Sequence, residues 1–123
     1  MQIHLSSFYS SDLKRSAGRF EKQAKQMEVY DQIHIFNQDD LNEDFKKYIA
    51  SLLKLGKIRG YGHWVWQTYI HQKVLSKMND GDIYHWCDIG CHLNKKGVTR
   101  LKEYIQIVKN NDNGCLFFSY MKP

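Results

Sequence analysis

Hydrophobic and polar residues follow two periods along this chain, one typical of strands and one typical of helices. Residues 2–8 and 32–36 are predicted to be short strands, and the second has the β-branched alternation of a strand within a sheet. Between them, apolar residues recur at steps of three and four, which places one apolar stripe along a helix. These residues are Leu13, Ala17, Phe20, Ala24 and Met27.

The same periods continue through the rest of the chain. Asp40 and Glu43 stand ahead of an apolar-periodic segment, where they form a predicted capping box, and Gly56 predicts the end of that helix. The remaining elements are predicted as a helix over residues 65–78, a strand over 82–90, a helix after Asn94 and a strand over 115–120.

This order of elements predicts the fold class. Strands separated by helices of about ten or more residues indicate parallel crossovers, so we predict an α/β fold. Its sheet is expected to be mainly parallel, with about four strands flanked by helices in a Rossmann-like arrangement. A length of 123 residues and a hydrophobic share of 42% fit one domain over residues 1–123. The last predicted strand would leave an open sheet edge, through which a homo-oligomer can form.

Charge and aromatic content point to an anionic or planar ligand. The formal net charge of +5 favours nucleic acid, acidic lipid or the diphosphate of a nucleotide sugar, and its sign does not choose among them. Lys and Arg are spread over residues 14–25, 46–59 and 95–100, which favours solvated helix surfaces over a nucleic-acid patch. Trp66 is predicted to lie in the core. For Trp64, which follows three closely spaced glycines, core and pocket are equal alternatives.

Composition also indicates where the protein works. No apolar run reaches the roughly eighteen residues of a membrane span, and the N-terminus lacks the pattern of a signal peptide. We therefore expect a soluble protein of the cytoplasm. Cys87, Cys91 and Cys115 form an odd set in a domain that does not need cross-links, so we expect reduced thiols.

Candidate binding residues follow the predicted strands. Ligands of open parallel sheets bind beyond the carboxyl ends of the strands, where loops and helix N-termini meet. There we expect the hydroxyls of Ser6 and Ser7 and the ring of Tyr9 to hold a nucleoside. Asn37, after the second strand, is expected to bind the edge of a base or ribose. The alternative for each serine alone is that it caps a helix.

Asp88 is the candidate metal ligand. A lone carboxylate at the end of an apolar strand is costly to bury unless a cation or hydrogen bonds compensate its charge. A manganese or magnesium ion shared with a diphosphate is such a cation. Gly90 removes side-chain bulk where a phosphate or sugar would approach. The alternative is an Asp that only turns the chain at a strand end.

The neighbouring sequence "HWCDIGCH" permits a second interpretation. Its members His85, Cys87, Cys91 and His92 are types that bind zinc, but a structural zinc site usually takes a second ligand pair, and only Cys115 is available. A cysteine nucleophile would need a base and a positive environment, for which His92 is only a sequence neighbour. Packing explains His85 and Cys87 adequately.

The stretch "RGYGHWVWQTYIHQKVLSKMNDGDIYHWCDIGCHLN", residues 59–94, resembles bacterial glycosyltransferase-like proteins of the GT-A nucleotide-diphospho-sugar transferase superfamily. In that group a Gly- and aromatic-rich segment leads into a helix, a Gly-Asp turn and a strand that ends in a motif like "DIGC". The resemblance is close over the second half of the chain and covers the donor-binding part. It implies that Asp88 coordinates a divalent metal on the donor diphosphate and that residues 60–66 help form the donor pocket, including Gly60, Tyr61 and Trp64.

Three departures from the family pattern bear on activity. Gln67 and Thr68 stand where the group usually has a Lys-Pro pair, and Gly90 stands where many members have a second Asp. Such transferases also continue beyond the segment that corresponds to residues 115–120, so we expect a truncated form. Retained transfer activity and binding without transfer are both open.

Two functions from different classes are therefore expected alternatives. The first is transfer of a sugar from a nucleotide donor to an envelope saccharide, as in lipopolysaccharide biosynthesis. In that case a metal at Asp88 and a basic group such as Arg59 neutralise the leaving diphosphate. No catalytic base is identified. The second is a basic module that binds RNA or free nucleotides without catalysis.

Overall fold

A computed structural model describes residues 1–119 of the chain as eight main helices and strands joined by short turns. The first half contains β1 (Ile3–Tyr9), α1 (Lys14–Met27), β2 (Gln32–Asn37) and α2 (Glu43–Lys54). The second half contains α3 (Gly60–His63), α4 (Gln67–Leu75), β3 (Ile83–Trp86) and α5 (Val98–Lys109). Single 3₁₀ turns, η1 (Ser11–Leu13), η2 (Gln38–Asp40) and η3 (Lys95–Gly97), precede α1, α2 and α5.

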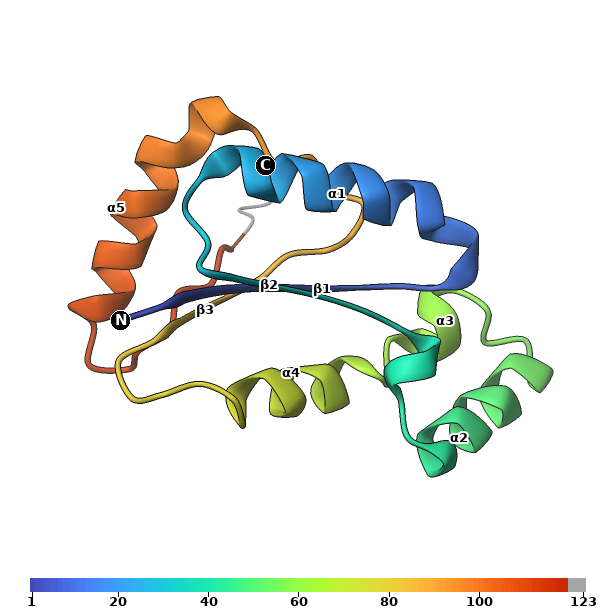
Figure 1. The fold of residues 1–123 in the computed structure, drawn as a ribbon. Coiled ribbons are helices and arrows are strands. Elements are labelled where there is room, and N and C mark those ends of the chain that lie inside the picture. Colours follow the sequence, from blue (N-terminus) through green and yellow to red (C-terminus); the bar gives the residue numbers. More distant parts are fainter. Residues whose placement is uncertain (120–123) are drawn as a thin grey trace.

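The three strands form one parallel sheet in the order β2-β1-β3. Tyr9 pairs in register with Asn37 on β2, and Ser6 pairs with Trp86 on β3. In Figure 1, α1 and α5 lie on one side of the sheet and α4 lies on the other, with α2 and α3 near the carboxyl ends of β1 and β2. The α/β class and the parallel sheet flanked by helices are therefore confirmed.

Two predicted strands differ from the structure. Residues 115–119 form no strand, and residue 120 lies outside the described residues. β3 is shorter than the predicted 82–90, because the chain leaves the sheet after the amide of Cys87 donates to the carbonyl of Ser6 at 3.1 Å. Asp88 consequently lies beyond the strand, in the turn that follows it.

The apolar stripe predicted for the first helix faces the sheet. Ala17, Phe20 and Ala24 of α1 pack on Leu5 of β1 and on Ile89, from the segment after β3. Met27 is buried as well, whereas Leu13 precedes the helix and stays exposed. The period of 3.6 residues thus predicted the buried face of α1 correctly.

The opposite face of the sheet carries an aromatic-rich core. Ile70 and Val74 of α4 are fully buried, and Trp66, just before α4, stacks on Phe8 with ring centroids 3.9 Å apart. The indole N–H of Trp66 donates to the carbonyl of Gly60 at 2.9 Å, so its polar atom is satisfied. The prediction that Trp66 is a core residue is confirmed.

The start of α2 differs from the predicted capping box. Asn42 is the N-cap, and its side-chain oxygen accepts from the amide of Phe45 at 2.8 Å. Asp40 instead accepts from the amide of Asn37 and closes a capping box on η2. The prediction failed because two possible caps stand close together in sequence, and only the turn between them decides which one meets the helix.

Asp82, in the turn before β3, ties together the amino-terminal ends of the strands. Its carboxylate accepts from the amides of Gln2 at 2.8 Å and Asn79 at 3.0 Å, and lies 3.2 Å from Nε2 of His4. The other ring nitrogen of His4 lies 3.1 Å from Nε2 of His34 on β2. The bond from the Asn79 amide, followed by that from Gln2, holds the pKa of Asp82 below its usual value.

Replacing Asp82 with asparagine is expected to lower stability in a pH-dependent way. Because the pKa of Asp82 is lowered by folding, its carboxylate stabilises the fold above its ordinary pKa of 3.8 and loses this effect as the pH falls through the folded-state value. Thermal melts should show Asp82→Asn a few degrees below the wild type near neutral pH, with the gap closing as the pH falls below the ordinary pKa of 3.8. Asp80→Asn, in the same turn and exposed, is the control. A gap that stays constant across the pH range would contradict this role.

Candidate functional site

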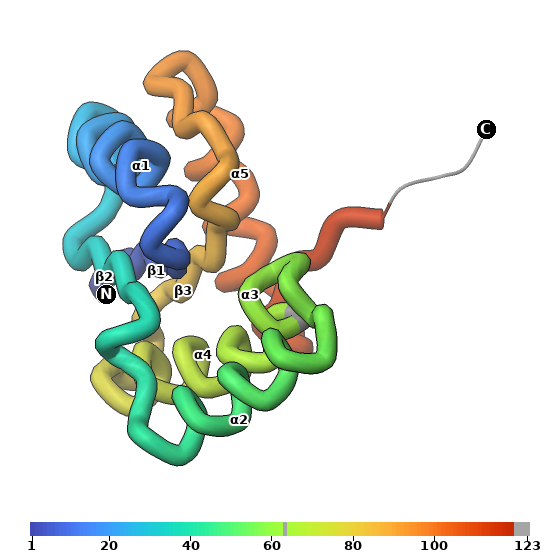
Figure 2. Tube along the Cα trace, turned by 90° about the vertical axis from the view of Figure 1, so that its right-hand side faces the viewer, coloured from blue at the N-terminus to red at the C-terminus, as the bar shows by residue number. Residues whose placement is uncertain are grey.

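The carboxyl ends of the strands form one edge of the sheet, around which α1, α3 and the segment after β3 lie (Figure 2). Tyr9 ends β1 and Asn37 ends β2, and the side-chain nitrogen Nδ2 of Asn37 donates to the hydroxyl of Tyr9 at 3.2 Å. The side-chain oxygen of Asn37 accepts from the amide of Asp39 at 2.8 Å. These two predicted residues are therefore adjacent, and Asn37 also caps the turn that follows.

The side chains of Ser6 and Ser7 are buried and are not accessible to a ligand at this edge. Both are fully buried within β1, and the Ser6 hydroxyl lies 3.0 Å from that of Tyr84, which in turn lies 2.7 Å from Nδ1 of His71. The Ser7 hydroxyl is buried and has no hydrogen-bond partner within residues 1–119. Strand alternation turns each side chain into a covered face of the sheet, so we remove Ser6 and Ser7 from the candidate donor-binding residues.

Asp88 is exposed and organises a tight turn. Its Oδ2 accepts from the amide of Gly90 at 3.2 Å, and its carbonyl accepts from the amide of Cys91 at 2.9 Å. A Cβ on residue 90 would lie 3.1 Å from Oδ2, so glycine there lets the carboxylate approach the backbone closely. Among the ion pairs of residues 1–119, none involves Asp88. Its carboxylate thus has no cationic partner in that part of the chain. The expectation that Asp88 would be buried was wrong: the side chain is exposed, so water can solvate its charge and no burial cost calls for a cation.

Arg19 holds the turn that contains Asp88, and sequence reasoning missed it. Its guanidinium donates to the carbonyl of Cys91 at 2.7 Å and to that of Ile89 at 2.9 Å. Gln23, one helical turn further along α1, accepts from the amide of Leu93 at 3.0 Å. The segment after β3 is therefore anchored to α1. No local pattern marks Arg19, because its partners lie about seventy residues away in sequence.

The Gly-rich segment forms a compact loop around α3. Gly60 and Gly62 have positive φ, and so do Tyr61 at 49° and Trp64 at 57°. The Trp64 ring covers Gly60 so closely that a Cβ there would lie 2.3 Å from it. The guanidinium carbon of Arg59 lies 5.8 Å from the centre of the same ring, and Trp64 is 44% exposed. Arg59, Gly60 and Trp64 are thus brought together at the surface.

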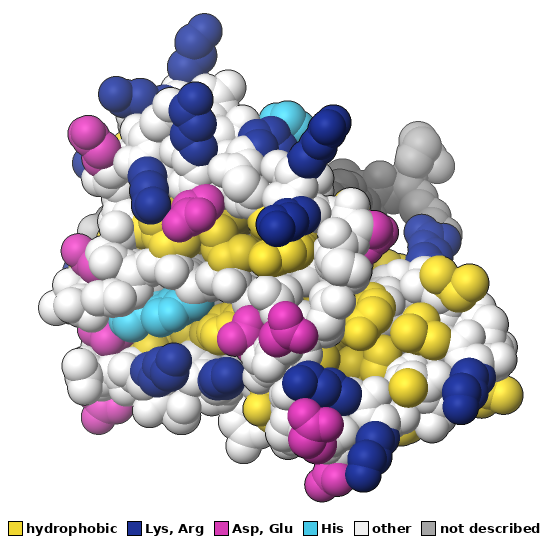
Figure 3. Space-filling view, turned by 45° about the vertical axis from the view of Figure 1, so that its right-hand side comes forward, with side chains coloured by type: hydrophobic (Ala, Val, Ile, Leu, Met, Phe, Trp, Pro, Cys, Tyr) yellow, Lys and Arg dark blue, Asp and Glu magenta, His cyan; other side chains and the backbone are white. Residues whose placement is uncertain are grey.

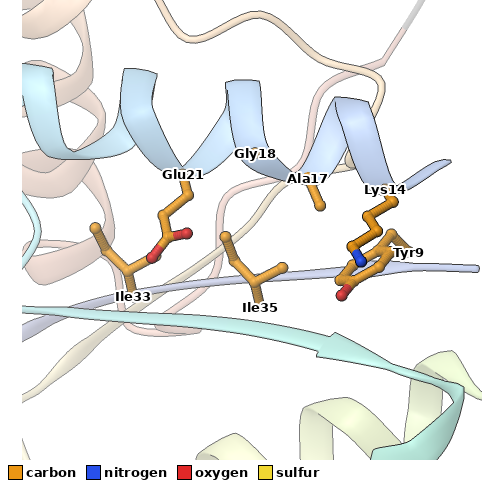
Figure 4. A pocket seen from close by; sticks show the side chains of 7 residues that line it. All are labelled: Tyr9, Lys14, Ala17, Gly18, Glu21, Ile33 and Ile35. Atoms are coloured by element: carbon orange, nitrogen blue, oxygen red, sulfur yellow. The ribbon is translucent and has the colours of Figure 1, made fainter. Parts of the chain in front are cut away.

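A groove of about 390 Å³ runs between α1 and the edge strand β2. Its floor contains Ile33 and Ile35, and Tyr9 and Lys14 lie at one end while Glu21 projects further along (Figure 4). Asp88 does not line this groove. Tyr9 is the one predicted site residue that lines the groove. Lys14 and Glu21 were not predicted, because they are polar and lie outside the apolar stripe of α1 on which the sequence prediction was based.

The zinc and cysteine-nucleophile interpretations gain no support. Burial, and then the neighbouring Cys91, raises the pKa of the Cys87 thiol to about 12, so Cys87 is protonated near neutral pH. Nδ1 of His85 lies 2.8 Å from the Tyr30 hydroxyl, and burial lowers the pKa of His85. Residues 1–119 contain no group of three or more His, Cys, Asp or Glu side chains placed to hold a metal ion. Asp88 alone supplies one carboxylate, which requires the remaining ligands to come from a bound molecule.

No protein-family model matches the chain, and no curated protein and no solved structure matches it significantly. Within the described residues, no helix is both long and apolar enough to cross a lipid bilayer. The resemblance of residues 59–94 to GT-A transferases therefore stays a prediction.

Proposed function

We propose that this chain is the donor-binding part of a GT-A glycosyltransferase-like protein and that it binds a nucleotide sugar at the carboxyl edge of its sheet. One observation carries the proposal. The exposed carboxylate of Asp88, without a cationic partner in residues 1–119, sits in a turn that hydrogen bonds from Arg19 and Gln23 tie to α1. A hydrogen-bonded turn beyond a parallel strand that presents one accessible carboxylate suits a cation bound with a diphosphate.

The groove beside Tyr9 is the candidate site for the nucleoside. Its apolar floor offers a surface for the flat face of a base, and the Tyr9 hydroxyl and Lys14 ammonium offer polar contacts at one end. Asn37 remains a candidate for a ribose or base edge through its amide nitrogen, which already contacts Tyr9. This assignment replaces the two buried serines with Lys14.

The diphosphate is assigned to the turn that contains Asp88 and Gly90, and the sugar is assigned to the surface around Arg59 and Trp64. Asp88 supplies one oxygen to a divalent metal that binds together with the diphosphate, and Gly90 leaves room for the phosphate beside it. Manganese or magnesium held there by Asp88 and the ligand would offset the negative charge of the diphosphate. Arg59 adds a positive charge, and the exposed ring of Trp64, with Gly60 beneath it, offers a stacking surface for the sugar. Tyr61 is half-buried and packs on Phe8, with ring centroids 6.2 Å apart, so it is not assigned to this surface.

The proposal extends to the wider fold and setting. It takes the three-stranded parallel sheet as the core of a Rossmann-like, single-domain donor module that works in the cytoplasm on an envelope saccharide as acceptor. A homo-oligomer through an exposed edge of the sheet belongs to the same hypothesis. No side chain is assigned as a catalytic base, so donor binding is the activity proposed for this chain.

Thermal unfolding with UDP or GDP and manganese tests this function. A nucleotide at one hundred times its Kd is expected to stabilise the protein by about 2.7 kcal/mol, which corresponds to several degrees. Asp88→Asn keeps an oxygen that can accept from the Gly90 amide but removes the charge, so it should abolish the manganese-dependent part and leave the unliganded melt unchanged. Asp112→Asn, exposed after α5, is the matched control.

The same assay separates the proposal from its alternative. Single-stranded RNA is expected to change the melt little, with or without manganese. If RNA stabilises the protein as much as the nucleotides do, and Asp88→Asn has no effect on either, the chain is a basic nucleotide- or RNA-binding module and the donor-site proposal is wrong.

A further inference from the structure

The outer surface of α2 and the loop after it exposes large apolar side chains. Leu55 and Ile58 are each 73% exposed, and Tyr48, at the i–7 position from Leu55 on α2, is 52% exposed. Three exposed lysines lie among them in sequence: Lys47, Lys54 and Lys57. We call these six residues the α2 patch. Figure 3 shows hydrophobic side chains gathered over α2 and α3, with Lys and Arg around them and a few Asp and Glu at the lower border.

The loop that carries the patch is held in one conformation. Gly56 has a φ of 82° directly after the C-cap Leu55, the amide of Gly56 donates to the carbonyl of Leu53, and that of Lys57 donates to Leu52. This is the hydrogen-bond pattern of a Schellman motif. The amide of Gly62 also donates to the carbonyl of Lys57 at 3.1 Å. Leu55 and Ile58 therefore project from an ordered loop, so docking does not have to order it first.

The charge along the segment that carries the patch is mainly positive, although the first turn of α2 holds the exposed Glu43 and Asp44, and Glu43 pairs with Lys46 at 3.3 Å. Between Asp44 and Asp80 the sequence contains no acidic residue, and it contains seven basic ones. These are Lys46, Lys47, Lys54, Lys57, Arg59, Lys73 and Lys77. A partner that covers the apolar side chains must therefore accept several positive charges at the rim of the contact.

We propose that the α2 patch docks the protein on a membrane surface that contains acidic phospholipids. Leu55 and Ile58 enter the boundary between headgroups and acyl chains, the Tyr48 ring lies at headgroup depth, and the lysines contact lipid phosphates. The aliphatic side chains of Leu55 and Ile58 favour a membrane over RNA as the partner, because RNA bases stack on aromatic and guanidinium groups. In a dimer formed through the α2 patch, the lysines of one copy would face those of the other, and their repulsion disfavours self-association.

Docking in this way gives the molecule an orientation. Because α2 and α3 lie near the carboxyl ends of β1 and β2, a membrane beneath the patch brings that edge of the sheet toward the bilayer (Figure 1). The inference rests on exposure and charge alone and does not depend on the proposed donor site. Failure of one therefore does not decide the other.

Vesicle sedimentation of the full chain tests the proposal. Wild type should bind vesicles of phosphatidylcholine with about 30% phosphatidylserine, and should bind pure phosphatidylcholine at least tenfold more weakly. Lys54→Gln/Lys57→Gln is expected to weaken binding to the acidic vesicles about 25-fold, from roughly fivefold for each lysine. Leu55→Ser/Ile58→Ser is expected to weaken it about tenfold or more. All four positions are exposed, and circular dichroism checks that both variants stay folded.

Matched substitutions elsewhere serve as controls. Leu75→Ser removes an apolar side chain that is 54% exposed at the end of α4, and Lys102→Gln/Lys109→Gln removes two charges from α5. Neither should change binding. The proposal is wrong if wild type binds neither vesicle, if the controls weaken binding as much as the patch variants, or if neutral and acidic vesicles bind equally. A dimer in solution that Leu55→Ser/Ile58→Ser dissociates would assign the patch to self-association instead.

Discussion

Replacing Gly60 with alanine is expected to destabilise the protein by about 2–3 kcal/mol, through backbone conformation and a steric clash together. Gly60 has a φ of 66°, in the left-handed region, which costs an alanine about 1–2 kcal/mol. The new Cβ would lie 2.3 Å from the Trp64 ring, so that ring must leave its place over the backbone. Its displacement also separates it from Arg59, and the candidate sugar-binding surface would be lost with it.

Gly56→Ala is the matched control for this prediction. Gly56 also has a positive φ, of 82°, but a Cβ there meets nothing within 4 Å. It should cost only the backbone contribution of about 1–2 kcal/mol. Urea unfolding of both variants measures the difference, which isolates the contact between Gly60 and Trp64. Equal losses of stability would show that the Trp64 ring moves aside freely and that its position does not depend on Gly60.

Arg19→Met is expected to cost about 2–3 kcal/mol and to release the turn that holds Asp88. The guanidinium donates to the carbonyls of Ile89 and Cys91, and a hydrogen bond to a charged group contributes roughly 1.5–3 kcal/mol. Methionine keeps a long apolar stem and good helix propensity, so α1 itself should persist. Hydrogen exchange should speed up at the amides of residues 88–93. Manganese-dependent binding of UDP or GDP should weaken as well, because the carboxylate is no longer held in place.

Arg15→Met controls for the loss of one positive charge from α1. Arg15 is exposed on the same helix, and no hydrogen bond or ion pair of its side chain is present in residues 1–119. Its replacement is expected to change stability by less than about 0.5 kcal/mol and to leave exchange at residues 88–93 unchanged. If the two variants behave alike, the bonds from Arg19 do not anchor the turn.

The candidate site was predictable only in part. Tyr9 and Asn37 follow strands that the sequence predicts, and parallel pairing places them side by side. Lys14 could have been predicted only if the order of the strands were known, because the groove that it lines lies between α1 and the edge strand β2. Arg19 could not have been found, since a single arginine on an amphipathic helix carries no signal for a contact with residues 89 and 91.

Local periodicity by itself determined the strands β1 and β2, the buried stripe of α1 and the parallel α/β arrangement, because these depend on spacings within a few residues. Only the tertiary structure decided how deeply each face is covered. It buried Ser6 and Ser7, ended β3 before Asp88 and left Leu55 and Ile58 exposed. The reason is that a two-residue or 3.6-residue period assigns a side chain to a face, whereas exposure depends on which distant segment packs against that face.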